Sequence, residues 1–243
     1  MHILAIIIVS EEGGIQMSEM KQRLESVLER IEKAAKKVGR TPSEITLVAV
    51  SKNFPAEAVR EAFSLGVRNF GENRAQELKD KYEKLSDIQA TWHFIGRIQT
   101  NKVKYFVPIV EYVHSVWREK ELTEINKRAK MVNKVMKVFL EVNVSGEATK
   151  AGVKPENLRN LLDFAKSLEN IKVIGLMTMA PIAENPEEIR WVFKKLRELR
   201  DELKKDYPDV TELSMGMSGD FEVAIEEGAT FVRIGTAIFG KRT

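Results

Sequence analysis

Short apolar runs alternate with longer amphipathic stretches along most of this chain. The runs are rich in Val, Ile and Leu, a composition typical of strands that are buried on both faces of a parallel sheet. The chain contains eight such runs, at residues 45–52, 68–72, 91–96, 112–116, 138–144, 173–179, 212–217 and 231–235. The pattern therefore predicts eight strands.

The stretches between the runs carry apolar residues at helical spacing. Examples are residues 55–65, 118–132, 155–168 and 186–205. Three of these stretches begin with a proline, which suits the first turn of a helix. A further apolar stripe from Leu24 to Val38, followed by Gly39, predicts one more helix ahead of the first strand.

Repeated strand–helix units predict the fold class. Eight units in a chain of 243 residues match an α/β protein of the (β/α)8 TIM barrel type. A doubly wound open sheet is the alternative, but it usually has fewer strands and a switch point. No composition break divides the chain, so we expect a single barrel domain over residues 17–243. Residues 1–16 would form an N-terminal extension, to which we assign no role.

Composition narrows the range of partners. Lys and Arg exceed Asp and Glu by 39 to 36, and the basic residues are mixed with acidic ones instead of clustering, so we expect no nucleic-acid partner. The apolar run at residues 3–9 is too short to span a bilayer, so we expect no membrane partner. Arg197 and Asp201 are spaced for an ion pair on one solvated helix face.

The chain has no cysteine. This excludes a disulfide, a thiolate zinc site and a cysteine nucleophile. It also suits the reducing conditions of the cytoplasm, where we expect the protein to act. We expect no metal site.

Lys52 is the last residue of the first predicted strand, at the end where α/β folds place their active sites. A desolvated lysine can lose its proton near neutral pH and condense with a carbonyl group to form a Schiff base. The alternative is that Lys52 only ends the strand and reaches solvent.

The last two predicted strands are followed by residues that suit an anion. Ser218 and Gly219 lead into one helix, and Gly235 and Thr236 lead into another. The unpaired N–H groups at a helix start favour a negative charge, and barrels commonly bind phosphate after strands seven and eight. Alternatively, Ser218 only caps its helix and the glycines make room for turns.

Motifs at the ends of nearly all the predicted strands carry a resemblance that extends roughly from Met20 to the carboxyl terminus. They are Ala49-Val-Ser-Lys52, Gly71-Glu-Asn73, His93-Phe-Ile-Gly96, Gly175-Leu-Met-Thr-Met-Ala180, Met215-Gly-Met-Ser-Gly-Asp220 and Arg233-Ile-Gly-Thr-Ala-Ile-Phe-Gly240. Together they resemble the pyridoxal-phosphate homeostasis protein family, which is similar to the amino-terminal barrel domain of alanine racemases. The resemblance implies that the chain binds pyridoxal 5′-phosphate (PLP).

The resemblance also assigns roles to residues. Lys52 would form the internal aldimine with PLP, and Arg233 would pair with the pyridine nitrogen. The phosphate would be held by Ser218, Gly219, Gly235 and Thr236. An arginine at the pyridine nitrogen can only donate a hydrogen bond, which weakens PLP as an electron sink. The alternative for Arg233 is a salt bridge within the barrel.

Two other assigned residues leave more than one interpretation open. Asn73 would bond to the ring or the Schiff-base region, or cap the following helix. Met177 would pack on the pyridine face, or only fill the barrel. Among the predicted strand ends, His93 and His114 are either neighbours of the ring or hydrogen-bonded core residues.

Departures from the racemase pattern suggest a carrier instead of an enzyme. We expect the chain to lack the second domain of the racemases, together with the tyrosine base that this domain supplies. The predicted function is to hold PLP on Lys52 in intracellular PLP homeostasis, as a monomer that passes PLP to apo PLP-dependent enzymes. One alternative is a weak PLP-dependent amino-acid racemase or decarboxylase. Others are a cofactor-free aldolase and an interaction scaffold with a vestigial site.

Overall fold

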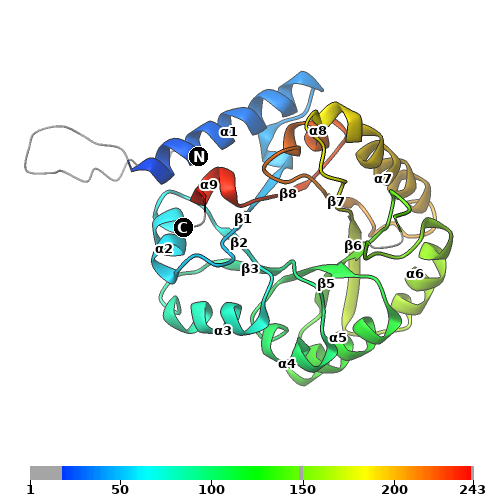
Figure 1. The fold of residues 1–243 in the computed structure, drawn as a ribbon. Coiled ribbons are helices and arrows are strands. Elements are labelled where there is room, and N and C mark those ends of the chain that lie inside the picture. Colours follow the sequence, from blue (N-terminus) through cyan, green and yellow to red (C-terminus); the bar gives the residue numbers. More distant parts are fainter. Residues whose placement is uncertain (1–17, 148–149, 242–243) are drawn as a thin grey trace, which may run out of the picture.

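The strands of this computed structural model form a closed parallel barrel with helices around its outside (Figure 1). The structure describes residues 18–147 and 150–241, so the predicted extension at residues 1–16 lies outside the described residues. The strands pair in sequence order, and β1 also pairs with β8. Their bounds are β1 Thr46–Val50, β2 Asn69–Glu72, β3 Thr91–Phe94, β4 Tyr112–Val116, β5 Met136–Glu141, β6 Ile171–Met177, β7 Glu212–Ser214 and β8 Phe231–Ile234.

The closed barrel confirms the predicted fold and rules out the open sheet. Each observed strand overlaps one predicted run, although β5 and β6 begin two residues before theirs. Most strands end earlier than their run, because the residues that follow belong to loops. β7 is the shortest of them. The chain leaves the sheet soon after it, and a side chain at Gly216 would lie 2.7 Å from the Cβ of Ala224.

The helices follow the predicted amphipathic stretches. Their bounds are α1 Glu19–Lys37, α2 Ala56–Ser64, α3 Ala75–Lys84, α4 Val103–Phe106, α5 Glu119–Met131, α6 Leu158–Lys166, α7 Arg190–Leu203, α8 Phe221–Glu226 and α9 Thr236–Phe239. Short 3-10 turns that begin at Pro155 and Pro186 precede α6 and α7. No helix within the described residues is long and apolar enough to cross a membrane.

Helix α1 packs across the seam where the barrel closes. Ser18 caps it by accepting a hydrogen bond from the N–H of Lys21, and its buried face includes Leu24 and Ile31. The helix lies beside α8 (Figure 1), and Arg30 binds Glu222 of α8 through two contacts of 2.7 Å. α1 therefore fastens the helix that begins beside the predicted anion site.

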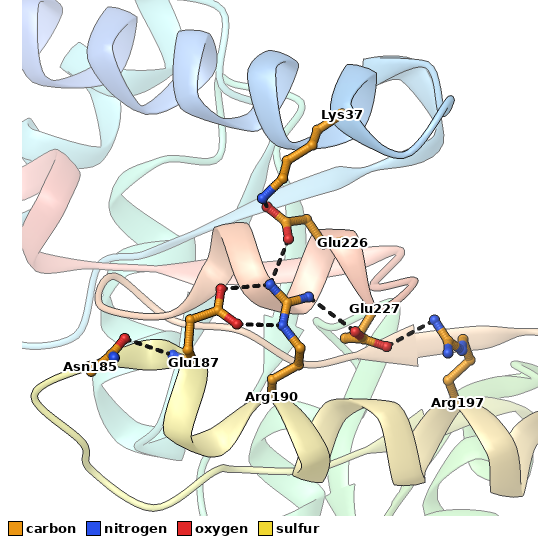
Figure 2. Close-up of polar contacts among 7 residues, drawn as sticks. All are labelled: Lys37, Asn185, Glu187, Arg190, Arg197, Glu226 and Glu227. Carbon is orange, nitrogen blue, oxygen red and sulfur yellow. Dashed lines mark hydrogen bonds and ion pairs between the residues drawn. The ribbon is translucent and has the colours of Figure 1, made fainter.

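Charged side chains connect the carboxyl end of α8 to α1 and α7 (Figure 2). Arg190 contacts Glu187, Glu226 and Glu227, and Lys37 contacts Glu226 from α1. Arg197 reaches Glu227 at 2.9 Å.

The predicted pair between Arg197 and Asp201 is wrong. Asp201 pairs with its neighbour Arg200 instead. The side chain of Glu227 is only 11% exposed and offers Arg197 a less hydrated partner than a carboxylate on an open helix face.

Candidate functional site

Lys52 lies in the loop that follows β1, and this loop contacts the loop that follows β8. The Lys52 side chain is half-buried. Phe54 stacks on Phe239 of α9 with 5.1 Å between the ring centroids. A Cβ atom at Gly235 would lie only 3.2 Å from the carbonyl oxygen of Val50, at the end of β1. The close approach of these two loops places Lys52 on the same rim as Gly235 and Thr236.

The loop that follows β7 joins the same rim. The Ser218 Oγ accepts a hydrogen bond from the N–H of Ala237 in α9, at 3.4 Å. The N-cap residue of α8 is Asp220, so Ser218 does not cap that helix. Gly219 is exposed and has no other atom within 4 Å of the place where a Cβ would stand. The four predicted phosphate residues therefore lie in two contacting loops, beside open space at Gly219.

Arg233 lies inside the barrel, close to this rim. Its side chain projects from β8 and the residue is 5% exposed. It donates one hydrogen bond to the Ser214 Oγ at 2.5 Å and another to the carbonyl oxygen of Thr178 at 3.1 Å. Burial lowers the pKa of Arg233 to about 10, an effect that the nearby carboxyls of Glu141 and Asp220 oppose. Arg233 is therefore a buried cation at neutral pH whose two hydrogen-bond partners are neutral.

A chain of hydrogen bonds runs from Arg233 across the barrel interior. The His114 Nδ1 lies 2.8 Å from the Ser214 Oγ, and its Nε2 lies 2.9 Å from the His93 Nδ1. The His93 Nε2 lies 3.0 Å from the Asn69 Oδ1. Both histidines could be named from their places in predicted strands, whereas Ser214 and Asn69 could not, because they lie on strands distant in sequence.

The direction of every bond in this chain follows from its ends. Arg233 can only donate, so the hydroxyl of Ser214 accepts from it and donates its own proton to His114. Asn69 Oδ1 can only accept, so each imidazole carries its proton on Nε2. Burial lowers the pKa of His93 to about 3, and burial together with the charge of Arg233 lowers the pKa of His114. The two histidines are therefore neutral core residues that orient Ser214 toward Arg233.

Glu141 is a further group near Arg233 that sequence analysis missed. It ends β5 and is 4% exposed. Burial raises its pKa to about 7, and the charge of Arg233 limits the rise. Glu141 lies in the middle of the predicted run 138–144, where a carboxyl among apolar residues was the available signal. The site thus contains an acid that gains or loses its proton near neutral pH.

Asn73 and Met177 occupy different surroundings. Asn73 is half-buried, and its buried Oδ1 has no hydrogen-bond partner among the described residues. α3 takes Arg74 as its N-cap, so Asn73 does not cap it. Met177 is 2% exposed and packs inside the barrel against Val48 and Phe139. This packing favours the interpretation of Met177 as barrel filler.

The sequence is similar to proteins of known families. Residues 23–243 match the family model described as alanine racemase, N-terminal domain. The chain is 54% identical over 222 residues to the pyridoxal phosphate homeostasis protein of Aquifex aeolicus, covering 91% of this chain and 97% of that protein.

Solved structures agree with this relationship. The structure of PipY of Synechococcus elongatus with PLP bound has a TM-score of 0.80 and 36% identity, covering 91% of this chain and all of that one. An alanine racemase of Clostridium difficile has a TM-score of 0.68 at 18% identity, covering 91% of this chain and 57% of that one, and shows a shared fold alone. The chain therefore belongs to the family of pyridoxal phosphate homeostasis proteins, which share the barrel of the alanine racemase N-terminal domain.

Proposed function

We propose that this protein binds PLP reversibly through Lys52 and holds it for intracellular PLP homeostasis. The observation that carries the proposal is the contact between three loops on one rim. They bring Lys52 onto the same rim as the residues that we assign to the phosphate, namely Ser218, Gly219, Gly235 and Thr236. The relatives at high identity bear the name pyridoxal phosphate homeostasis protein, and PipY has a structure with PLP bound.

The residues present fit the cofactor. Backbone N–H groups at two helix starts and the hydroxyls of Ser218 and Thr236 suit a phosphate. Arg233 offers a donor to the pyridine nitrogen. Among the described residues the Asn73 Oδ1 has no hydrogen-bond partner, and the bound group would supply one. PLP brings an aldehyde, with which an unprotonated lysine amine forms an imine and releases one water molecule.

The surroundings of the site favour holding the cofactor over turnover. Arg233 is a donor, and it gives no proton to the ring nitrogen, which limits PLP as an electron sink. Tyr112 lies at the opposite end of its strand from the rim and stacks on His93 with 4.6 Å between the ring centroids. It is therefore poorly placed to act as the tyrosine base of the racemases.

One observation favours the enzymatic alternative. Glu141, with a pKa of about 7 beside Arg233, is a carboxyl able to accept a proton at neutral pH. A weak racemase or decarboxylase activity would use such a group. Sustained turnover of an amino acid by the loaded protein, lost in Glu141→Gln, would support this alternative. Deuterium exchange at Cα without turnover would leave the carrier function in place.

A spectrum of the protein mixed with PLP tests the proposal. We expect an imine absorption band in the wild type and its absence in Lys52→Arg, which keeps the positive charge. Borohydride reduction followed by peptide mass spectrometry should place the cofactor on residue 52. Attachment to another lysine, or equal attachment in both proteins, would contradict the proposal.

The carrier function also requires release. We propose that the protein acts as a monomer in the cytoplasm and passes PLP to apo PLP-dependent enzymes. The loaded protein should restore activity to such an apo-enzyme in a sealed mixture without free PLP, and sedimentation should show a single chain. Failure to restore activity at any concentration would leave storage as the only role.

A further inference from the structure

A buried lysine lies beneath the Lys52 loop. Lys81 projects from α3 and is only 5% exposed. Its ammonium group donates to the carbonyl oxygen of Ser51 at 2.7 Å, to the Glu72 Oε1 at 2.6 Å and to the Glu77 Oε1 at 2.8 Å. An ammonium has three protons, and each of them has an acceptor here.

The partners of Lys81 bind the residues on both sides of Lys52. The Ser51 hydroxyl donates to the same Glu72 Oε1 at 2.6 Å. On the other side, the backbone N–H of Asn53 donates to the same Glu77 Oε1 at 2.5 Å. We call Ser51, Asn53, Glu72, Glu77 and Lys81 the Lys81 bracket. Through it, one ammonium fixes the peptide groups that precede and follow Lys52.

The backbone at this loop needs such support. Asn53 has φ of 65°, in the left-handed region that residues other than glycine rarely adopt. Asparagine tolerates this region better than most residues, but the conformation persists only where its surroundings hold it. The bond from Asn53 to Glu77 supplies this hold, and it sets the direction in which the chain leaves residue 52.

The Lys81 bracket contains an ion pair between Lys81 and Glu72, although burial of charged groups costs free energy. Glu72 is fully buried, and burial raises its pKa while the charge of Lys81 opposes the rise. Lys81 stands on the buried face of α3, which it shares with Ala75 and Leu78. Buried ion pairs often add little to stability compared with apolar packing. The bracket therefore points to a requirement for geometry at the adjacent loop.

We propose that Lys81 is a positioning residue for Lys52, acting through Glu77 and Ser51 to aim the Lys52 amine at the aldehyde of the ligand. This inference rests on the proposed function. It predicts that the bracket governs attachment of PLP to residue 52 and leaves recognition of the phosphate and the pyridine nitrogen unchanged. The residues that we assign to those two groups lie on β8 and on the loops that follow β7 and β8.

Variants at Glu77 test this with a matched pair. Glu77→Ala removes the acceptor for the N–H of Asn53, whereas Glu77→Gln keeps an oxygen there. Glu83→Ala is the control, since Glu83 lies on the same helix and makes only a 3.6 Å surface pair with Lys79. Lys81→Met is a second probe of the bracket. Its outcome counts where its circular dichroism spectrum matches that of the wild type.

Two ligands separate the orientation of the Lys52 amine from binding of the ring and phosphate. The rate of PLP attachment is followed by absorption and borohydride trapping. The Kd of pyridoxine 5′-phosphate, which has the ring and phosphate but no aldehyde, is measured by calorimetry. We expect Glu77→Ala to slow attachment by about tenfold or more, as misplacement of a reacting group does. Glu77→Gln and Glu83→Ala should stay close to the wild type, and the Kd should be unchanged in all three.

Several results would overturn the inference. Attachment at the wild-type rate in Glu77→Ala would show that the bracket does not aim Lys52. An equal loss of attachment and of pyridoxine 5′-phosphate binding would show a merely structural role. Failure of the wild type itself to attach PLP at residue 52 is a different outcome, which would overturn the proposed function together with this inference.

Discussion

Two arginines in this protein have opposite surroundings. Arg190 lies at the start of α7 and contacts three carboxylates of the same chain, which raise its pKa (Figure 2). Arg233 lies inside the barrel, where burial lowers its pKa to about 10 and its hydrogen-bond partners are a hydroxyl and a carbonyl oxygen.

The difference separates a cation that is paired with carboxylates from one whose hydrogen-bond partners are neutral. The charge of Arg190 is neutralised by carboxylates of the protein itself. Arg190 therefore connects α7 to α8 and has no need of a ligand. Arg233 is held in place by neutral groups, and the chain from Ser214 to Asn69 keeps those groups oriented. A buried cation that has no bonded anion among the described residues is costly, which favours a ligand that adds a hydrogen-bond acceptor.

Replacement of each arginine by leucine should give the largest difference between the two, in the affinity for the ligand. Arg233→Leu removes a charged donor, so we expect the Kd for pyridoxine 5′-phosphate to rise by about tenfold to a hundredfold, as calorimetry would show. Arg190→Leu should leave this Kd unchanged. Similar losses in both variants would mean that Arg233, too, only maintains the structure.

The pH dependence of stability should report on Glu141, the buried carboxyl near Arg233. Glu141 has a pKa raised to about 7 in the folded protein, so between its unfolded pKa and pH 7 the unfolded chain releases a proton that the folded one keeps. Stability from this group is therefore full at low pH and is lost as the pH rises. Urea unfolding should show about 2 kcal/mol less loss between pH 5 and 8 in Glu141→Gln than in the wild type. Parallel curves would contradict this.

Stability measurements at two salt concentrations should show the structural role of Arg190. Its side chain is 27% exposed, so solvent screens its ion pairs. We expect Arg190→Leu to lower the free energy of unfolding by about 1 to 2 kcal/mol at low salt, because three carboxylates lose their shared partner. The effect should shrink in 1 M salt. A change that is independent of salt would point to lost packing instead.

The smallest change is expected at the two buried histidines, which should not titrate between pH 8 and pH 5. His93 and His114 should remain neutral, with the proton on Nε2, from pH 8 to pH 5, because burial lowers both pKa values. Nitrogen chemical shifts of the imidazole rings report this directly. Protonation of either ring near pH 6 would show that the hydrogen bonds from Arg233 to Asn69 do not have the donors and acceptors inferred here.

The fold could be predicted because its signal is local. Each strand is a short apolar run, and eight of them with intervening helices match one closed architecture. The strand ends also identified Lys52, Ser218 and Gly235, since residues that directly follow parallel strands meet at one rim. Their roles toward PLP remain predictions.

The missing parts of the site depend on contacts between distant segments. Ser214 and His114 are far apart in sequence, and only the barrel register brings them together. Lys81 looks like any lysine of an amphipathic helix until the rotation of α3 turns it inward. The pairing of Arg197 and Asp201 failed for the same reason, because spacing along a helix says nothing about Glu227 on another.

Closure of the barrel by β1 and β8 would also set the time at which the proposed site can load PLP. The ribosome makes β1 and Lys52 early, and the residues of β8 and α9 emerge roughly 180 residues later. At about 5 to 20 residues per second, the lysine waits on the order of 10 to 40 seconds for them. A nascent chain thus carries Lys52 before the loops that follow β7 and β8 exist, so loading of PLP at the proposed site would have to follow synthesis of α9.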